Sequence, residues 1–255
     1  MVNYILEENK AQGADVSRWQ DIDTTPQQID FKKMKANGAN FVYIRATLGP
    51  NIDPDFIYNW KTAKEAGLLR GAYHAHQFNS NLLNQIYNFV NIMTPDWGEL
   101  PMALDVERLL FVGVALPTLR LKLKEVLEEL EKNTKQHPFP YMQLPMLYTN
   151  PDILQNVLGY YTPWITKYPL WIAHYGVTVP RPGPLYNTYR FWQYTDRGPG
   201  LDYGTESKQI DLDYFNGTLN DLLIFSQRDI TLTQEERLDR IEQFLHEQLG
   251  YIIPK

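Results

Sequence analysis

Residues 100–107 read Leu-Pro-Met-Ala-Leu-Asp-Val-Glu, a short apolar run that ends in two acidic side chains. A continuous apolar run of this length is typical of a strand that is buried on both faces of a sheet. Similar runs recur along the chain, rich in β-branched or aromatic residues and bounded by turn formers. The eight runs are Ala14–Val16, Phe41–Thr47, Leu69–His76, Leu100–Glu107, Leu144–Thr149, Leu170–Tyr175, Arg190–Tyr194 and Gln209–Phe215.

Stretches with helical periodicity separate the early apolar runs. They are Ile29–Ala36, Pro54–Ala66, Asn81–Met93 and Pro117–Lys132. Strands that alternate with helices predict a mainly parallel sheet, and eight such strands in about 210 residues predict closure into a barrel. Only a proline-rich stretch, residues 176–189, separates two of the later runs. We therefore predict an α/β fold, a TIM-like barrel of eight strands whose second half uses loops and hairpin-like connections.

The pattern changes after Asp221. Residues 233–236, Thr-Gln-Glu-Glu, are typical of a helix N-terminus, and apolar residues up to Leu249 form one helical stripe. We therefore divide the chain into a barrel over residues 1–220 and a C-terminal helical extension over residues 221–255. The extension either packs back on the barrel or begins a short coiled coil, and the second case would allow self-association.

The composition excludes several classes of function. The chain has 24 basic and 30 acidic residues, a net charge of −6 and no basic block, which argues against nucleic acid as a partner. It has no cysteine, so thiolate catalysis and cysteine-ligated zinc are excluded. No segment approaches the ~20 apolar residues of a membrane span. The first residues lack the pattern of a signal peptide, so we expect another route of release if the protein acts outside the cell.

Asp105 and Glu107 close the fourth apolar run. Alternate strand residues are about 6.6 Å apart and point to one face, so both carboxyl groups should project into the mouth of the barrel. Such neighbours differ in environment, so that one keeps its proton while the other ionises, as glycoside hydrolysis requires. An isolated D-x-E is short and common, and it also occurs as a pair of exposed acids at a strand end.

Two further acids belong to the first and last strands. Asp15 closes the first strand, and Asp211 lies on the last strand with Asp213 on the same face. In a closed barrel the eighth strand neighbours the first, so Asp211 should approach Asp15. Four acids would then ring one opening, although Asp15 alone also suits a turn or helix cap.

Aromatic residues make up 13% of the chain, and several fall at or near strand ends. Many must be core residues, but their recurrence at one end of successive strands favours a groove that stacks on sugar rings. Gln193 would add hydrogen bonds to hydroxyl or acetamido groups. The candidate substrate-binding residues are Tyr73, Tyr148, Trp171, Tyr175, Trp192 and Gln193.

An ordered set of motifs over roughly residues 11–220 resembles the family 25 glycoside hydrolases, the muramidases typified by Chalaropsis lysozyme and by bacterial and phage lysins. The motifs include GADVSRWQ at residues 13–20, FVYIRAT at 41–47, GAYH at 71–74, LDVE at 104–107, LYTN at 147–150, LWIAHY at 170–175, WQY at 192–194 and IDLDYFNG at 210–217.

The resemblance implies a (β/α)5(β)3 barrel that cleaves the β-1,4 bond between N-acetylmuramic acid and N-acetylglucosamine in the glycan strands of peptidoglycan. It implies that Glu107 is the general acid and that Asp105 acts at the anomeric centre or assists the substrate's 2-acetamido group. Asp15 and Asp211 match two further acids of the groove. No cofactor or metal is implied, and the site of action is the cell wall. Leu48 stands where the family often has a glutamate, and residues 75–78 also depart from the common pattern.

Two other classes of function compete with this interpretation. His74 and His76 share a strand face, as the H-x-H pairs of metal-dependent hydrolases do. The other class is a barrel that has lost its catalytic activity and only binds carbohydrate, since a fold does not dictate a function. Such a protein would usually have lost one of the acids, whereas this chain retains all four.

Overall fold

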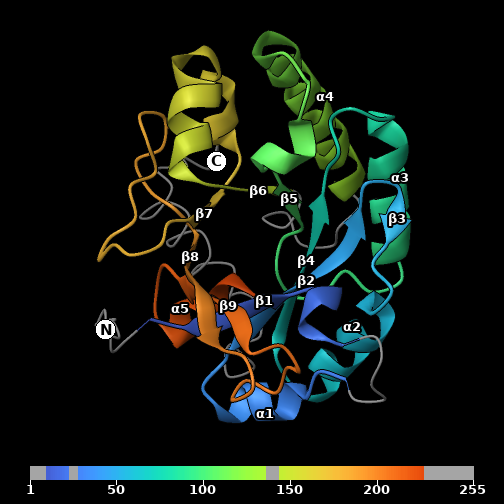
Figure 1. Ribbon diagram of the computed structural model, residues 1–255, viewed down its shortest axis with the longest axis vertical. Helices are drawn as coiled ribbons and strands as arrows, with labels where there is room; N and C mark the ends of the chain where they lie inside the picture. Colours follow the sequence, from blue (N-terminus) through green and yellow to red (C-terminus); the bar gives the residue numbers. More distant parts are fainter. Residues whose placement is uncertain (1–9, 23–27, 136–143, 227–255) are drawn as a thin grey trace, which may run out of the picture.

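The computed structural model describes residues 10–22, 28–135 and 144–226. Its strands form one sheet. The strands are β1 (Gln12–Val16), β2 (Phe41–Leu48), β3 (Asn51–Ile52), β4 (Leu69–Ala75), β5 (Ala103–Asp105), β6 (Met146–Thr149), β7 (Leu170–Ala173), β8 (Phe191–Pro199) and β9 (Gln209–Phe215). The hydrogen-bonded order is β1-β9-β8-β7-β6-β5-β4-β2-β3, and a further pairing of β1 with β2 closes the barrel. The predicted eight-stranded barrel is thus confirmed, with β3 as a two-residue addition to β2 (Figure 1).

Among the eight barrel strands, the direction changes only at β9; the short added strand β3 also runs antiparallel to β2. Each pairing from β1 through β2, β4, β5, β6 and β7 to β8 is parallel. The last strand, β9, runs antiparallel to both of its neighbours, β8 and β1. A hairpin therefore inserts β9 between β8 and β1, which agrees with the predicted change from helical to hairpin-like connections.

Helices cover the first half of the barrel. The four predicted helices are found within two residues of their predicted limits. Side-chain caps fix the starts of two of them, because Asp30 accepts hydrogen bonds from the amides of Lys32 and Lys33, and Asn81 accepts one from Asn84. The helices are α1 (Phe31–Ala36), α2 (Phe56–Glu65), α3 (Leu82–Met93), α4 (Leu116–Thr134) and α5 (Leu219–Phe225). The short helical turns are η1 (Arg18–Gln20), η2 (Arg108–Phe111), η4 (Ile153–Leu158), η5 (Gly159–Tyr161) and η6 (Pro163–Lys167).

Two apolar layers hold the barrel together. One layer lies between the strands and the helices and includes Leu104, Phe89 and Leu123. The other fills the inside of the barrel with aromatic rings, among them Tyr43 and Trp171, whose ring centres are 4.6 Å apart. Alternation along each strand divides the side chains between these two layers.

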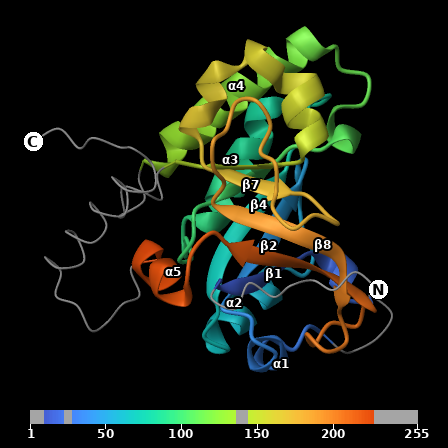
Figure 2. The ribbon, with the colours of Figure 1, turned by 90° about the vertical axis from the view of Figure 1, so that its left-hand side faces the viewer.

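Helix α5 closes one end of the barrel. Its residues Leu222 and Phe225 pack with the interior aromatic cluster, and the Phe225 and Phe215 ring centres are 5.6 Å apart. The helix lies across the expected boundary at residue 221, so barrel packing continues at least to Phe225. The helix predicted over residues 233–249 lies outside the described residues. Figure 2 shows that α5 lies at the end of the barrel opposite to the carboxyl ends of the parallel strands.

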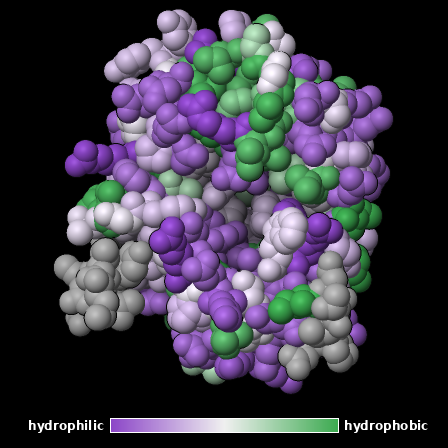
Figure 3. All heavy atoms as spheres, in the orientation of Figure 1, coloured by the Kyte–Doolittle hydropathy of each residue, from purple (hydrophilic) through white to green (hydrophobic). Residues whose placement is uncertain are grey.

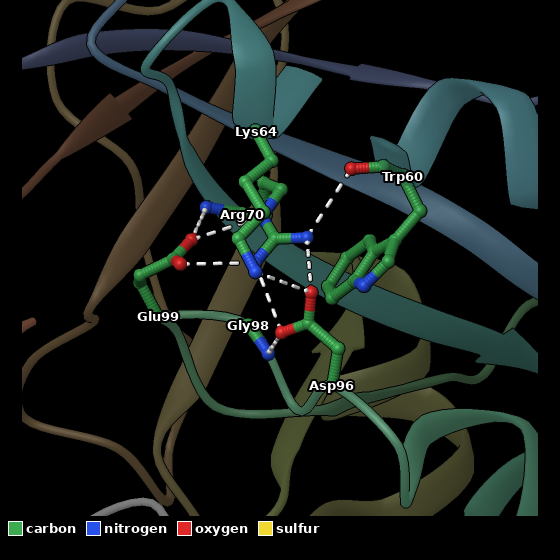
Figure 4. A network of polar contacts seen from close by, with 6 residues as sticks. All are labelled: Trp60, Lys64, Arg70, Asp96, Gly98 and Glu99. Atoms are coloured by element: carbon green, nitrogen blue, oxygen red, sulfur yellow. Dashed lines mark hydrogen bonds and ion pairs between the residues drawn. The ribbon is translucent and has the colours of Figure 1, made fainter. Parts of the chain in front are cut away.

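A buried arginine ties the start of β4 to the loop that leads into β5 (Figure 4). The Arg70 side chain is fully buried and forms ion pairs of 2.9 Å with both Asp96 and Glu99. Its guanidinium also donates to the carbonyl of Trp60 at 3.2 Å and lies 4.4 Å from the Trp60 ring centre. The network joins α2, β4 and this loop at the end of the barrel far from the carboxyl ends of the strands.

The face at which the parallel strands end is hollowed near its centre, and hydrophilic residues predominate around the hollow (Figure 3). In a barrel of parallel strands, this is the end at which functional side chains gather. Among the described residues, no helix is long and apolar enough to cross a membrane.

Candidate active site

A cavity of ≈ 220 Å³ lies at the carboxyl ends of the parallel strands. It contains all four acids that the sequence analysis singled out. The lining residues are Asp15, Ser17, Trp19, Gln20, Arg45, Tyr73, Asp105, Glu107, Tyr148, Trp171, Gln193 and Asp211.

The two acids of the D-x-E motif reach the cavity from the end of β5. Leu104 points outward into the layer beneath the helices, so its neighbour Asp105, the last residue of the strand, points inward. Glu107 follows two residues later, just before η2, and its side chain makes no capping hydrogen bond to that turn. Both carboxyl groups therefore face one cavity, as their spacing predicts.

The other two acids come from the strands that close the barrel. Asp15 on β1 and Asp211 on β9 are direct partners in the antiparallel pair. Because β9 runs against the other strands, Asp211 lies near its start and still reaches the same end of the barrel as Asp15. The expected approach of these two residues is confirmed.

Gln193 links the aromatic part of the lining to the acids. Its Nε2 donates to Asp15 Oδ2 at 2.6 Å, and its Oε1 accepts from the hydroxyl groups of Tyr148 at 2.8 Å and Tyr175 at 2.5 Å. Tyr73, Tyr148 and Trp171 line the cavity. Tyr175 is not part of the lining but holds Gln193 from the side.

Trp192 occupies a different position from the one expected. Adjacent residues of a strand point to opposite faces, so Trp192 turns away from the cavity where Gln193 turns into it. Its indole Nε1 donates to the carbonyl of His174 at 2.8 Å, and its ring packs in the outer layer, 6.0 Å from that of Tyr214. This location corrects the expectation that Trp192 belongs to the substrate groove.

Sequence reasoning missed Arg45, which is the one cation among the lining residues. Arg45 lies on β2 two positions after Tyr43, on the inward face, and its Nε donates to Asp53 Oδ2 at 2.7 Å. A charged residue inside the otherwise apolar run 41–47 was the available signal. Ser17, Trp19 and Gln20 also line the cavity, and they follow Asp15 directly in the sequence.

Burial controls the charge of the D-x-E pair. It raises the pKa of Asp105 well above the ordinary value, and the charges of Glu107 and Asp15 raise it further, while Arg45 opposes the shift. Burial also raises the pKa of Glu107. Asp105 Oδ1 is buried without a hydrogen-bond partner in the part of the chain that the structure describes, which leaves it available to a bound molecule.

The acids on β1 and β9 are perturbed in the same direction. Burial, followed by the charges of Asp15, Asp196 and Glu107, raises the pKa of Asp211 to about 8. Burial raises the pKa of Asp15 as well, with Asp213 and Glu107 adding to the shift. The cavity thus contains several carboxyl groups that keep their protons to higher pH than an ordinary aspartate or glutamate does. The general acid of a hydrolase needs this property.

His74 and His76 lie on the outward face of β4. Their rings are joined by a hydrogen bond of 2.9 Å between His74 Nε2 and His76 Nδ1, and His74 Nδ1 bonds Thr47 Oγ1 at 2.7 Å. The His74 ring stacks on Phe89 of α3 at 5.5 Å. Burial lowers the pKa of His74 to about 3 and that of His76 to about 2. No group of three or more His, Asp or Glu in the described part of the chain could hold a metal ion, so the metal-hydrolase alternative gains no support.

An acid-lined cavity at the mouth of a (β/α) barrel supplies the paired carboxyl groups that glycoside hydrolysis uses. The sequence model of glycosyl hydrolases family 25 matches residues 14–202, and the chain belongs to this family.

Relatives and solved structures agree with this assignment. The Escherichia coli K12 protein YegX is 34% identical over 221 residues, which cover 84% of this chain and 72% of that protein. Lysozyme M1 of Streptomyces globisporus is 28% identical over 221 residues, covering 83% of this chain and 70% of the lysozyme. The structure of the bacterial lysozyme from Streptomyces coelicolor superimposes with a TM-score of 0.68 at 27% identity, covering 86% of this chain and 97% of that one. The muramidase from Acremonium alcalophilum gives a TM-score of 0.64 at 27% identity, covering 86% of this chain and 100% of that one.

Proposed function

We propose that this protein is a peptidoglycan hydrolase, an N-acetylmuramidase that cleaves the β-1,4 bond between N-acetylmuramic acid and N-acetylglucosamine. Membership of family 25 and the similarity to lysozymes and muramidases support this activity. The observation that carries the proposal is that Asp105 and Glu107 face one cavity and that Arg45 acts on Asp105.

The two carboxyl groups of the D-x-E motif then take different parts. Close carboxyl groups that are buried together do not both ionise easily, so the pair retains a proton. Arg45 opposes the rise in the pKa of Asp105 that burial, Glu107 and Asp15 cause. We assign the retained proton to Glu107, which matches the general acid of the family. Glu107 donates this proton to the glycosidic oxygen as the bond breaks. Asp105 stabilises the positive charge at the anomeric carbon, directly or through the 2-acetamido group of the substrate.

The remaining predicted residues bind the sugar. Tyr73, Tyr148 and Trp171 offer aromatic faces to sugar rings, and Gln193 offers its amide beside Asp15. Asp15 and Asp211 hold the hydroxyl and acetamido groups at the mouth of the cavity.

Mass spectrometry of the fragments released from purified peptidoglycan tests this proposal. An N-acetylmuramidase leaves N-acetylmuramic acid at each new reducing end, and Glu107→Gln should release almost no fragments. A reducing-end N-acetylglucosamine, or fragments cut in the peptide part, would contradict the proposal.

The proposal extends to the organisation of the chain and to its place of action. Residues 1–220 together with α5 form the hydrolytic unit, and the rest of the expected extension self-associates. The protein works on the wall outside the cytoplasmic membrane. Because α5 ends at Phe225, the truncation that tests this division removes residues 227–255. The truncated chain should hydrolyse soluble wall fragments at the full rate. By light scattering, its particles should contain fewer chains than those of the full-length protein. An inactive but folded truncation would contradict the division.

A further inference from the structure

Asp213 is a completely buried carboxyl group that does not line the cavity. It lies on β9, two residues beyond Asp211 and on the same inward face. Its Oδ1 accepts a hydrogen bond of 2.7 Å from the indole Nε1 of Trp171. Its Oδ2 is buried and receives no N–H or hydroxyl donor from the described residues. A buried carboxylate oxygen in this state is costly unless a proton satisfies it.

The carboxyl group of Asp15 is the neighbour that meets this need. In the β1–β9 pair, Asp213 is opposite Gly13 and Asp15 is opposite Asp211, so Asp213 and Asp15 are diagonal neighbours on the inward face. Hydrogen bonding between the two carboxyl groups raises the pKa of Asp15 and lowers that of Asp213. Two carboxylates can only accept hydrogen bonds, so a bond between them requires a proton on one of them.

We propose that Asp213 is a positioning residue that holds Asp15 through one proton shared between the two carboxyl groups. The pair then carries one negative charge, and Asp15 presents a fixed oxygen to the cavity. The role assigned to Asp213 rests on the proposed muramidase function only in its effect on turnover, since the shared proton itself is a property of the free protein.

The second side of Asp15 is fixed by Gln193. The amide Nε2 of Gln193 donates to Asp15 Oδ2 at 2.6 Å. The hydroxyl groups of Tyr148 and Tyr175 both donate to Gln193 Oε1, which prevents the amide from turning over. Asp15 is thus held by an N–H donor and by the proton that it shares with Asp213.

The charges around the pair explain why it keeps the proton. Burial raises the pKa of both carboxyl groups, and the negative charge of Glu107 raises the pKa of Asp15 further. Among the described titratable groups that face the pair, the one cation is Arg45, which lines the same cavity as Asp15 and is itself paired with Asp53. The other groups are acids and tyrosines. Those that face Asp15 are Asp105, Glu107, Asp211, Tyr73, Tyr148 and Tyr175, and those that face Asp213 are Asp211, Tyr43 and Tyr194. A second negative charge on the pair is therefore unfavourable.

The substitution Asp213→Asn tests the shared proton with little change of shape. Its amide oxygen can still accept from Trp171, and its Nδ2 can donate to Asp15 without a proton that titrates. Carbon-13 NMR of the aspartate carboxyl groups in the full chain should show a coupled titration of Asp15 and Asp213 above their ordinary range. In Asp213→Asn, Asp15 should titrate in one step at lower pH. Asp202→Asn, on an exposed loop, is the matched control for the loss of one carboxyl group.

Turnover on peptidoglycan supplies the second readout. In Asp213→Asn the pH–rate profile for kcat should lose the ionisation of the pair, while kcat at pH 5 stays within about threefold of the wild type and KM is unchanged. Asp213→Leu, which offers no donor to Asp15, should lose about 10–100-fold in kcat if it folds.

Two results would overturn the inference: an Asp15 titration that is the same in Asp213→Asn as in the wild type, or identical pH–rate profiles for the two proteins. If the wild type does not cleave peptidoglycan but the NMR titrations differ as described, the proposed function fails and the shared proton is supported.

Discussion

Arg45 and Asp53 form a buried ion pair in which Arg45 Nε lies 2.7 Å from Asp53 Oδ2, with exposed side-chain fractions of 9% and 1%. Asp53 is itself fixed by the backbone amides of Arg18 at 3.3 Å and Asp55 at 3.1 Å. The pair therefore anchors the one cation of the cavity lining at a set place, where it lowers the pKa of Asp105 against the effect of burial.

Replacing this cation should move the acidic limb of the pH–rate profile. In Arg45→Gln, a donor to Asp53 remains but the positive charge is lost, so Asp105 ionises at higher pH. We expect the acidic limb of kcat/KM to shift upward by roughly one pH unit, the lower end of the usual effect of a nearby opposite charge. The measurement is the pH dependence of peptidoglycan hydrolysis. Arg45→Lys keeps the charge and should retain the wild-type limb, and an unshifted Arg45→Gln profile would remove Arg45 from this role.

Glu107→Gln should reduce turnover on peptidoglycan by about two to four orders of magnitude, because glutamine keeps the shape of glutamate but has no proton to donate. Glu107 makes no capping bond to η2, so the thermal unfolding midpoint should change little. Asp105→Asn should be similarly damaging, and the double variant should be little worse than either one, since both groups serve the same transition state. Steady-state rates of the three variants give this comparison, and near wild-type turnover in Glu107→Gln would exclude it as the general acid.

The free energy of unfolding should fall as the pH rises from about 4 to 8. The folded-state pKa of Asp211 is raised to about 8, mainly by burial, whereas an unfolded aspartate titrates near 3.9. Between these values the folded protein binds a proton that the unfolded chain has released, so this stabilisation is complete below the unfolded pKa and is lost as the pH approaches the folded one. Urea unfolding at pH 5 and pH 8 should differ by an Asp211 contribution on the order of 4 kcal/mol. Asp211→Asn should flatten the dependence, and an equal slope in this variant would contradict the expectation.

Arg70→Met should destabilise the fold without altering the chemistry. The substitution leaves Asp96 and Glu99 without their buried cation, and breaking a buried ion pair costs about 3–5 kcal/mol. Because the network lies at the end of the barrel away from the cavity, kcat of the folded fraction should equal that of the wild type. Denaturant unfolding and active-site-normalised rates measure the two effects. Lys61→Met, whose ion pair with Glu65 is exposed and 3.8 Å long, is the matched control and should change stability by less than about 1 kcal/mol.

Much of the barrel could be predicted because its strands are buried on both faces. In a run such as residues 41–47, the side chains on both faces of the strand are mainly apolar. This pattern distinguishes the run from an amphipathic strand or a surface helix. Neighbouring strands of a closed barrel then bring Asp15 to Asp211 without any long-range signal in the sequence. The D-x-E spacing similarly determined which face Asp105 and Glu107 share.

The missed features depend on which of two adjacent residues points inward. The aromatic run at residues 192–194 does not reveal that Gln193 faces the cavity and Trp192 the outer layer, because both faces of β8 are buried. Arg45 was overlooked because its charge is balanced by Asp53, which comes from a different segment beyond β3. The short helical turns between β6 and β7 carry no long periodic stretch from which a helix is predicted.

The insertion of β9 between β8 and β1 has a consequence for biosynthesis. Asp15 emerges from the ribosome well before Gln193, Asp211 and the α5 residues that fill the far end of the barrel. Contacts of such long sequence separation form only after the intervening chain has been made, and they close the barrel late. A nascent chain whose β9 has not yet emerged lacks Asp211, one of the four acids, so the wall-cleaving centre is assembled only after β9 has been made.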